Sequence, residues 1–417
     1  MSREATTQAD PRNVGAGKAV PMTPGSRRRA FVVVAVAIAL ALAASATPSP
    51  LYVEYEQRWH VSSALITAVY ACYAGGVVVA LLVVGGLSDR MGRRRTLMFS
   101  LALLAGSMAA FVAADNVVWL FAARLVQGVA TGVFTAAAAA ALTDLQAEDD
   151  GRRAGLVNST AQSLGIAAGA LAAGALAEWA PSPLRLAYVV IGAGCVVLLA
   201  LVGMFVPETV ALEPGLGVAR LLRPQPLAVP RETRKAFAWA AAGVVAAWSV
   251  GGVYLALGGA LAQGLLGIEN HLVGALTILC VQGAGGLFSL AFTSVSNQRA
   301  SLIAYGALIL GLLFSALAIA TAGDILFFGG AVITGLGFGL GFMSSTRRLT
   351  QAAPGDRRAE VMAAYFVTAY AAISVPALVA GVMSDRWGLA VAFYALAAVM
   401  GALSAALLVL SVRARPA

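Results

Sequence analysis

Residues 62–87 read SSALITAVYACYAGGVVVALLVVGGL, an uncharged apolar stretch that is followed at once by the basic segment SDRMGRRR of residues 88–95. An α-helix needs about 20 apolar residues to cross the ~30 Å hydrocarbon core of a bilayer, and this stretch is long enough. It lacks the ten-residue alternation of polar and apolar residues that is typical of a transmembrane β-barrel. The stretch therefore predicts a membrane-spanning helix that ends in a charged loop.

The same pattern of an apolar block and a short polar loop recurs along the whole chain. The chain is 60% hydrophobic and 11% charged, with a mean hydropathy of +0.85, whereas about a quarter of the residues of a soluble domain are charged. We therefore expect an all-α integral membrane protein in which twelve transmembrane helices form two pseudo-symmetric six-helix bundles. The expected spans are residues 30–50, 62–87, 96–113, 115–143, 153–178, 185–206, 236–261, 271–294, 299–320, 323–348, 359–382 and 389–411.

The polar segments around these blocks divide the chain. We expect a disordered cytoplasmic tail over residues 1–26, a first six-helix bundle over 27–206, a central cytoplasmic loop over 207–235, a second six-helix bundle over 236–412 and a cytoplasmic tail over 413–417. The prolines of the central loop are too many for one continuous helix. They are Pro207, Pro214, Pro224, Pro226 and Pro230.

Lysine and arginine fall almost entirely on one side of this topology. With both termini cytoplasmic, 24 of the 28 basic residues lie in cytoplasmic segments. The exceptions are Arg58, Arg185 and Arg386 on the outside and Arg124 within the fourth span. The positive-inside rule predicts this asymmetry, which therefore supports the twelve-span orientation.

The first block has a second interpretation, as a secretory signal peptide. Arg27, Arg28 and Arg29 precede the block, and Ala44-Ser45-Ala46 has the small-x-small form of a cleavage site. Cleavage there leaves eleven spans and places the basic loops on the wrong side, so the charge distribution favours twelve.

The two halves share local features at a separation of 205 residues. Gly151-Arg152-Arg153-Ala154 before the fifth block corresponds to Asp356-Arg357-Arg358-Ala359 before the eleventh, and Arg94 corresponds to Arg299. Two six-helix repeats related by an axis along the membrane normal are typical of transporters that bind their substrate between the repeats.

The most specific signal is the loop after the second block, Gly85-Gly86-Leu87-Ser88-Asp89-Arg90-Met91-Gly92-Arg93-Arg94-Arg95. It resembles the signature loop G-x-L-a-D-r-x-G-r-r of the major facilitator superfamily, and with the twelve blocks the resemblance covers nearly the whole chain. A plain positive-inside loop explains the arginines but not an acid framed by glycines. The resemblance implies a cytoplasmic latch that joins the two bundles in the outward-open state, with Asp89 near Arg357 and Arg358 at the start of the eleventh helix. The latch residues are Gly85, Asp89, Arg90, Gly92, Arg93 and Arg94.

The fourth block contains a second motif, Leu120-Phe121-Ala122-Ala123-Arg124-Leu125-Val126-Gln127-Gly128. It resembles the helix-four motif l-x-x-x-R-x-x-q-G of the same superfamily, in which the arginine is associated with proton coupling. An arginine in mid-span is costly in hydrocarbon and needs an interior partner. The resemblance makes Arg124 and Gln127 candidates for proton coupling. The alternative is that Arg124 lies near the outer end of its helix and snorkels to water.

The first block ends in Thr47-Pro48-Ser49-Pro50, and two prolines break a helix and free carbonyl groups. Glu54 follows this break and is a third candidate for proton coupling, because no acidic residue lies deep within any block. The alternative is that Glu54 and Glu56 lie in the outer headgroup region beside Arg58 without a specific role. The scarcity of acids within the spans also argues against strongly cationic substrates.

The fifth block departs from the pattern of drug–proton antiporters, which carry a Gly-Pro pair in helix five. Here Ala170 follows Gly169, and small residues at this spacing also serve ordinary helix packing. The departure counts against antiport.

Polar and aromatic residues of the central helices are candidates to line a substrate cavity. Amphipathic rings and a few amides in an apolar cleft suit an organic molecule of modest size. The candidates, in addition to Gln127, are Tyr70, Tyr73, Asn158, Gln162, Trp248, Tyr254, Gln282, Tyr365 and Tyr370.

Together these features predict a secondary active transporter of a bacterial inner membrane that exports small, moderately hydrophobic organic compounds by proton antiport with alternating access. Proton-coupled or facilitated uptake of a sugar or organic acid is the alternative. The blocks contain no nucleophile with a base and no cluster of acids, and the chain has no Walker-type loop, so neither an enzyme nor direct ATP drive is expected.

Few partners are expected. Two histidines, His60 and His271, are too few for a histidine-based metal centre. We expect a proton gradient as the energy source, no cofactor and no metal, and a monomer that contacts a small-molecule substrate and the lipid bilayer but no nucleic acid.

Overall fold

The computed structural model describes residues 22–84, 87–146, 151–210, 227–267, 270–354 and 357–413, and all regular structure in these segments is helical. This part of the chain contains twelve spans that are long and apolar enough to cross a membrane, which confirms the expected fold.

The first six are α1 (Pro24–Ala46) with η2 (Ser49–Leu51) and α2 (Tyr52–Trp59), then α3 (Ser63–Val84), α5 (Arg93–Val112), α6 (Val117–Leu145), α7 (Gly151–Trp179) and α8 (Leu186–Phe205). The second six are α10 (Arg234–Leu266), α11 (His271–Ile278) with η4 (Leu279–Gly283) and α12 (Ala284–Ala291), then α13 (Asn297–Thr321), α14 (Asp324–Ala352), α15 (Arg358–Trp387) and α16 (Leu389–Arg413). Two short helices, α4 (Leu87–Met91) and η3 (Arg231–Thr233), lie between spans.

Polar side chains fix where several of these helices begin. The Asn116 side chain accepts hydrogen bonds from Val118 N and Trp119 N at the start of α6, and Asn270 does the same for the first turn of α11. Such caps satisfy amide groups that have no partner within the helix, which matters most at a membrane boundary.

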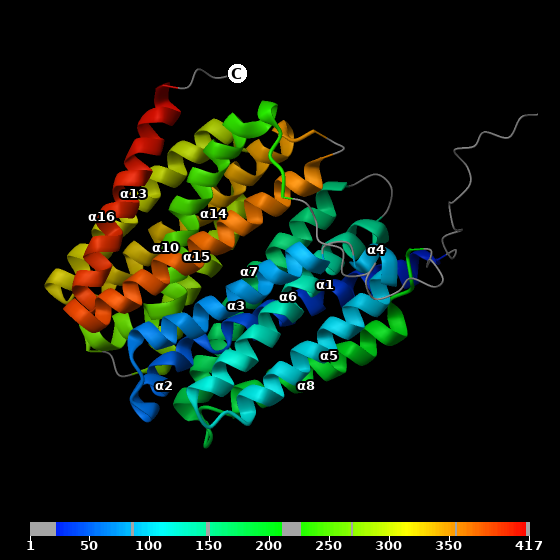
Figure 1. Ribbon diagram of the computed structural model, residues 1–417, viewed down its shortest axis with the longest axis horizontal. Coiled ribbons are helices and arrows are strands. Elements are labelled where there is room, and N and C mark those ends of the chain that lie inside the picture. Colours follow the sequence, from blue (N-terminus) through cyan, green and yellow to red (C-terminus); the bar gives the residue numbers. More distant parts are fainter. Residues whose placement is uncertain are drawn as a thin grey trace, which may run out of the picture.

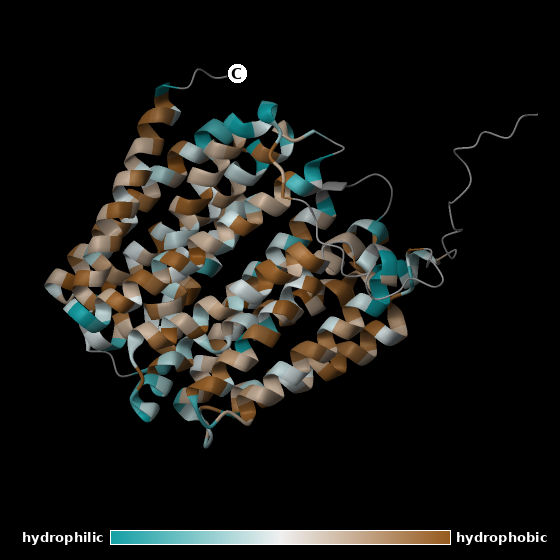
Figure 2. Ribbon diagram, in the orientation of Figure 1, coloured by the Kyte–Doolittle hydropathy of each residue, from teal (hydrophilic) through white to brown (hydrophobic). Residues whose placement is uncertain are grey.

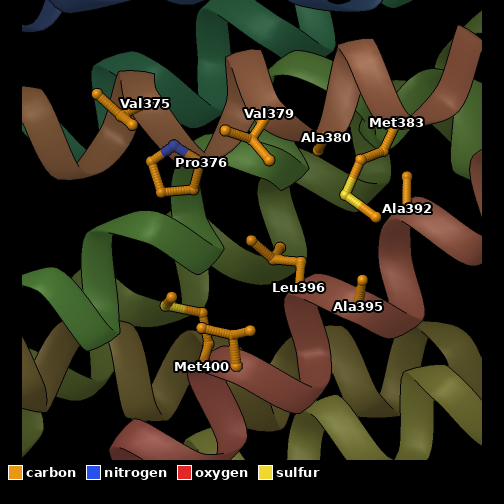
Figure 3. A pocket seen from close by; sticks show the side chains of 10 residues that line it. Val375, Pro376, Val379, Ala380, Met383, Ala392, Ala395, Leu396 and Met400 are labelled. Carbon is orange, nitrogen blue, oxygen red and sulfur yellow. The ribbon is translucent and has the colours of Figure 1, made fainter.

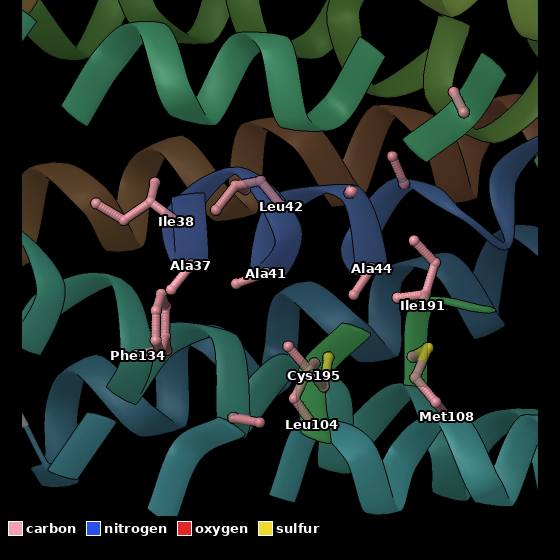
Figure 4. Packing of buried hydrophobic residues seen from close by; sticks show 14 of the residues in the cluster. Ala37, Ile38, Ala41, Leu42, Ala44, Leu104, Met108, Phe134, Ile191 and Cys195 are labelled. Carbon is pink, nitrogen blue, oxygen red and sulfur yellow. The ribbon is translucent and has the colours of Figure 1, made fainter. Parts of the chain in front are cut away.

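The helices form two groups, the first bundle (α1–α8) and the second bundle (α10–α16), which Figure 1 shows side by side. In the first bundle, α1 packs against α5, α6 and α8 through small and branched side chains such as Ala37, Ala41 and Ile191 (Figure 4). Cleavage after Ala46 would remove this helix from the core of its bundle.

The helices α2 and α4 mark opposite ends of the molecule (Figure 1), which we call the α2 end and the α4 end. The bundles meet where α3 packs on α15 and where α7 packs on α11, η4 and α12. The hydrophobic core runs across this boundary, since residues of α10, α11 and α15 belong to the same buried cluster as α1.

The outside of the helices is apolar, as lipid contact requires. Val197, Leu313 and Val399 are 58%, 58% and 60% exposed, and hydrophilic residues gather at the helix ends (Figure 2). A chain with this surface is a multi-pass membrane protein.

Two spans differ from simple helices. The first is interrupted after Ala46, as the proline pair predicted. The eighth contains a π-helical turn at Leu279–Gly283, which was not predicted from the sequence because π-helices have no clear sequence signature.

Candidate functional site

Arg124 of α6 is fully buried, with 0% of its surface exposed. Its Nε donates to Tyr52 Oη at 2.9 Å, and its Nη1 donates to Ser45 O at 2.8 Å and to Gln127 Oε1 at 2.6 Å. Its guanidinium lies 5.3 Å from the ring centre of Tyr73. The alternative in which this arginine snorkels to water is therefore wrong.

The break in the first span supplies hydrogen-bond partners for Arg124 and Gln127. Pro48 has no N–H group, so Ala44 O has no donor four residues later in its own helix. Gln127 Nε2 donates to that carbonyl at 2.8 Å, and Arg124 binds the neighbouring carbonyl of Ser45. Two features that the sequence analysis treated separately, the proline pair and the helix-four motif, thus form one buried network.

Aromatic residues lie on the helices that join the two bundles. Tyr70 and Tyr73 belong to α3, which packs against α15, the helix that carries Tyr370. Tyr370 meets Trp248 of α10 edge to face at 5.5 Å between ring centres, and Phe342 lies 5.1 Å from the same indole. These ring contacts bring two of the predicted cavity residues, Trp248 and Tyr370, together within the second bundle.

The predicted amide residues are also placed in the central helices. Gln282 lies in the π-helical turn, where its Nε2 is next to Gly251 of α10, and π-helical turns are frequent at functional sites. Asn158 and Gln162 lie on α7 and are half-buried. Asn158 Oδ1 and Trp248 Nε1 are buried and have no hydrogen-bond partner among the described residues.

Two of the predicted cavity residues lie elsewhere. Tyr254 is 1% exposed, donates to Ser315 Oγ at 2.8 Å and packs against Phe327 and Phe393 inside the second bundle. Tyr365 is fully buried and pairs with Thr346. Both tyrosines face other helices of their own bundle in this structure, and their assignment to a substrate cavity stays a prediction. Sequence hydropathy does not distinguish the face of a helix that looks inward to its own bundle.

The signature loop is described in part. Gly85 lies outside the described residues, as does the side chain of Asp89, and Arg90 lies at the end of α4. Gly92 has a φ of +94°, and a side chain there would collide with the carboxylate of Glu208. Glycine is needed at this position for both reasons.

Arg93 and Arg94 of this loop form bonds to acceptors of their own bundle. Arg93 N donates to Glu208 Oε1 at 2.6 Å, and its guanidinium pairs with Asp144 at 3.1 Å. Arg94 donates to the carbonyl of Gly203. In the second bundle Arg357 pairs with Glu360 at 3.0 Å, and Arg358 is the first residue of α15. The predicted contact of Asp89 with the start of α15 stays a prediction for the other conformation.

The α2 end carries polar contacts between the bundles. His271, at the start of α11, faces two acids of the first bundle, with Nδ1 3.1 Å from Glu178 Oε2 and Nε2 3.5 Å from Glu54 Oε2. Asp385 of α15 accepts from Ser63 N at 2.9 Å and from Ala64 N at 3.0 Å, and so caps α3 of the other bundle.

The sequence analysis assigned no role to His271, Glu178 or Asp385. The signal available was their position, since each is an ionisable residue at the edge of an apolar block. Glu54, in contrast, was singled out. Its side chain is 26% exposed at the α2 end and lies 3.5 Å from His271 Nε2, and both interpretations of its role stay predictions.

Two hollows are present in the described structure. A cavity of about 670 Å³ at the α2 end lies between the bundles and is lined by Glu56, Gln57, Ser63, Gln263, His271 and Ser384 together with apolar residues. A smaller groove of about 230 Å³ between α15 and α16 is lined by apolar side chains such as Pro376, Met383 and Leu396 (Figure 3). The groove offers no polar group that would orient a substrate.

The comparison with known families agrees with this architecture. A sequence profile described as Major Facilitator Superfamily matches residues 34–375, more than half of the chain. The chain belongs to the major facilitator superfamily. No curated protein sequence matches it significantly.

Solved structures of transporters share the superfamily fold with this chain. A bacterial homolog of the human lysosomal transporter Spinster, in an inward-facing and unoccupied conformation, has a TM-score of 0.74 at 14% identity, covering 94% of this chain and 98% of its own. The human organic anion transporter MFSD10 (TETRAN) has a TM-score of 0.61 at 18% identity, covering 93% and 100%. A mutant of the nucleoside transporter NupG has a TM-score of 0.70 at 13% identity, covering 92% and 99%.

Proposed function

We propose that this chain is a secondary active transporter that exports small, moderately hydrophobic organic compounds in exchange for protons by alternating access. The observation that carries the proposal is the way the bundles are joined. His271 and Asp385 of the second bundle bind the first bundle at the α2 end, whereas Arg93, Arg94 and Arg357 near the α4 end bind partners of their own bundle. This arrangement suits one of the two states of an alternating-access cycle.

The charge distribution supports the orientation. Arg90, Arg93 and Arg94 lie at the α4 end, and the positive-inside rule favours the cytoplasm for this end and for both termini. We propose that the described conformation is the one closed at the α2 end; the Spinster homolog was solved in an inward-facing conformation. We propose the cytoplasmic membrane of a bacterium as the location.

The aromatic group and the unpaired polar atoms support an organic substrate. Trp248 and Tyr370 form a ring contact in the second bundle, the helix of Tyr70 and Tyr73 packs against that of Tyr370, and Asn158 Oδ1 and Trp248 Nε1 are an acceptor and a donor without a partner among the described residues. The known substrates of two structural neighbours, organic anions and nucleosides, are likewise organic molecules.

Proton coupling is assigned to the network of Arg124, Gln127 and Tyr52, with Glu54 nearer the α2 end. The partners of Arg124 described above are neutral oxygens and ring faces. Uptake of an organic acid is the second candidate function, because this buried positive charge also favours an anionic substrate over a cationic one.

Inside-out vesicles with a respiration-acidified lumen and a pH-sensitive dye test the proposal. We expect a compound of a chemically broad panel to collapse the pH gradient with the natural protein and with Arg58→Lys, but not with Asp89→Asn. If organic acids move protons in right-side-out vesicles and no compound moves protons in inside-out vesicles, the result would support uptake instead of export. If none of the compounds moves protons in either preparation, proton coupling is contradicted.

A further inference from the structure

One imidazole bridges the bundles at the α2 end. His271 belongs to α11 of the second bundle, and its two carboxylate partners, Glu178 of α7 and Glu54 of α2, both belong to the first. The backbone N–H of His271 adds a bond of 3.0 Å to Glu178 Oε2. The contact is supported by close packing, since a side chain at Gly174 of α7 would lie 2.7 Å from Ala275 Cβ and 2.9 Å from His271 O.

The two contacts of this ring favour its protonated form over its neutral form. Both ring nitrogens face carboxylate oxygens, which only accept hydrogen bonds. A neutral imidazole has one N–H donor and one lone pair, so one nitrogen would face an acceptor with its own lone pair. The imidazolium form has a donor on each nitrogen and a charge opposite to that of its partners. Both contacts are therefore favourable only when His271 holds a proton.

Water from the α2 end reaches this ring. His271, Glu54 and Glu178 have 22%, 26% and 24% of their side chains exposed, and His271 lines the cavity of about 670 Å³. Protons of the compartment at this end therefore exchange with the ring without crossing the bundles.

The other described residues that line the cavity beside the ring carry no positive charge. The cavity wall carries Glu56 of α2, bonded to Ser63 Oγ, and α10 presents the neutral Gln263. Asp385 of α15 lies on the far side, where it caps α3. The charged groups that face His271 from the neighbouring elements are thus carboxylates.

We propose that His271, Glu54 and Glu178 form a proton-binding latch that closes the α2 end when it binds a proton from that side. Loss of the proton leaves two carboxylates facing a neutral ring and removes the attraction between the bundles. Closure is then favoured by acid on the α2 side. The inference rests on the proposed alternating-access cycle, and it assigns the outer closing step to a residue distinct from the Arg124 network.

Electron–electron distance measurements on the full chain in lipid nanodiscs test the latch. Spin labels are placed at Asp115→Cys, between α5 and α6, and Asp324→Cys, at the start of α14, after Cys72, Cys195 and Cys280 are replaced by alanine. Both label sites are exposed and lie at the α2 end in different bundles. The distance distribution is recorded between pH 5 and pH 8.5.

We expect the closed, short-distance population to grow at least threefold from pH 8.5 to pH 5 and His271→Gln to abolish this dependence. His60→Asn, which replaces the other histidine of the chain, keeps the dependence. Asp385→Asn lowers the closed population at every pH without removing its pH dependence, because it removes a cap of α3 and leaves His271 and its two carboxylate partners in place. Glu178→Gln shifts the midpoint to lower pH, since the imidazolium loses a counter-charge, and it provides a second test if His271→Gln folds poorly.

A wild-type pH response that survives in His271→Gln, or the absence of any response in the natural chain, would overturn the latch. These outcomes concern conformation alone, so they are separate from the vesicle assay. A His271-dependent closure without substrate-linked proton movement would leave the latch in place and remove the proposed export function.

Discussion

Arg124 illustrates how a single residue can be satisfied in the membrane interior without an acid beside it. A charged side chain in hydrocarbon is tolerated when it faces the bundle interior and finds partners there. The donors of Arg124 bind a phenol oxygen, a backbone carbonyl and an amide oxygen, and its face lies against Tyr52 and Tyr73. The planar fork of five donors makes arginine, not lysine, suited to this position.

Arg124→Lys is expected to lower the transport rate at least tenfold although it keeps the charge. The ammonium group cannot reach Tyr52, Ser45 and Gln127 together, so at least one buried acceptor loses its donor, at a cost of about 1–3 kcal/mol. Initial transport rates in proteoliposomes measure the effect, with Arg58→Lys at an exposed site as the matched control. Equal rates for the two variants would remove Arg124 from the coupling network.

Tyr254→Phe is expected to change stability but not substrate affinity. It removes the hydrogen bond to Ser315 within the second bundle, and interhelical bonds in membranes contribute about 0.6 kcal/mol, up to ~1.7 kcal/mol. Trp248→Ala is expected to raise the KM severalfold instead. Unfolding transitions in detergent and transport kinetics distinguish the two. A raised KM in Tyr254→Phe would place this tyrosine in the cavity.

Among the elements, the broken first span has the clearest consequence. Its proline pair ends α1 at Ala46 and turns the chain into η2 and α2. The carbonyl of Ala44, which Pro48 leaves without a donor, is taken by Gln127 of α6. The conformation of one helix is thus completed by the side chain of another.

A double-mutant cycle between Pro48→Ala and Gln127→Leu measures this dependence. In the natural background Gln127→Leu leaves the Ala44 carbonyl unpaired and costs about 1–3 kcal/mol. In the Pro48→Ala background the restored backbone N–H pairs with that carbonyl, and the same substitution is expected to cost less by about 1 kcal/mol. Free energies of unfolding in mixed detergent give the coupling. Additive effects would show that the proline and the glutamine act independently.

For the whole molecule, closure of the α2 end depends on the near contact of small residues as well as on charge. A side chain at Gly174 would overlap Ala275 and the carbonyl of His271, and one at Gly381 of α15 would overlap Thr67 and Ser63 of α3. Small residues let helices approach closely in membranes, where no hydrophobic force brings them together.

Gly174→Val is expected to shift the conformational equilibrium away from closure at the α2 end. The added methyl groups hold α7 and α11 apart, so the spin-label pair at Asp115 and Asp324 reports a larger long-distance population at every pH. Gly106→Val on α5, where a side chain meets no atom within 4 Å, is the matched control and is expected to leave the distribution unchanged. An unchanged distribution in Gly174→Val would mean that α7 and α11 are not in contact during closure.

Much of this architecture was available in the sequence. The twelve spans could be predicted from the lengths of the apolar blocks, because the thickness of the bilayer sets the number of apolar residues that a spanning helix needs. The proline pair after Thr47 located the break in the first span, and Arg124 was recognised as a buried charge in need of partners. These inferences depend on local chemistry and on the surrounding lipid, and none of them requires knowledge of which helices are neighbours.

Only the tertiary structure decided which residues meet. Ala44 and Gln127 are 83 residues apart, Ser63 and Asp385 are 322 apart, and Glu178 and His271 are 93 apart. Tyr254 and Trp248 are both aromatic residues of α10, yet Tyr254 packs against Phe327 and Phe393 whereas Trp248 packs against Phe342 and Tyr370. Hydropathy places a residue in the membrane but is nearly uniform around each helix. The rotation and neighbours of a helix are set by packing between distant segments, and that packing determines both the buried network and the latch.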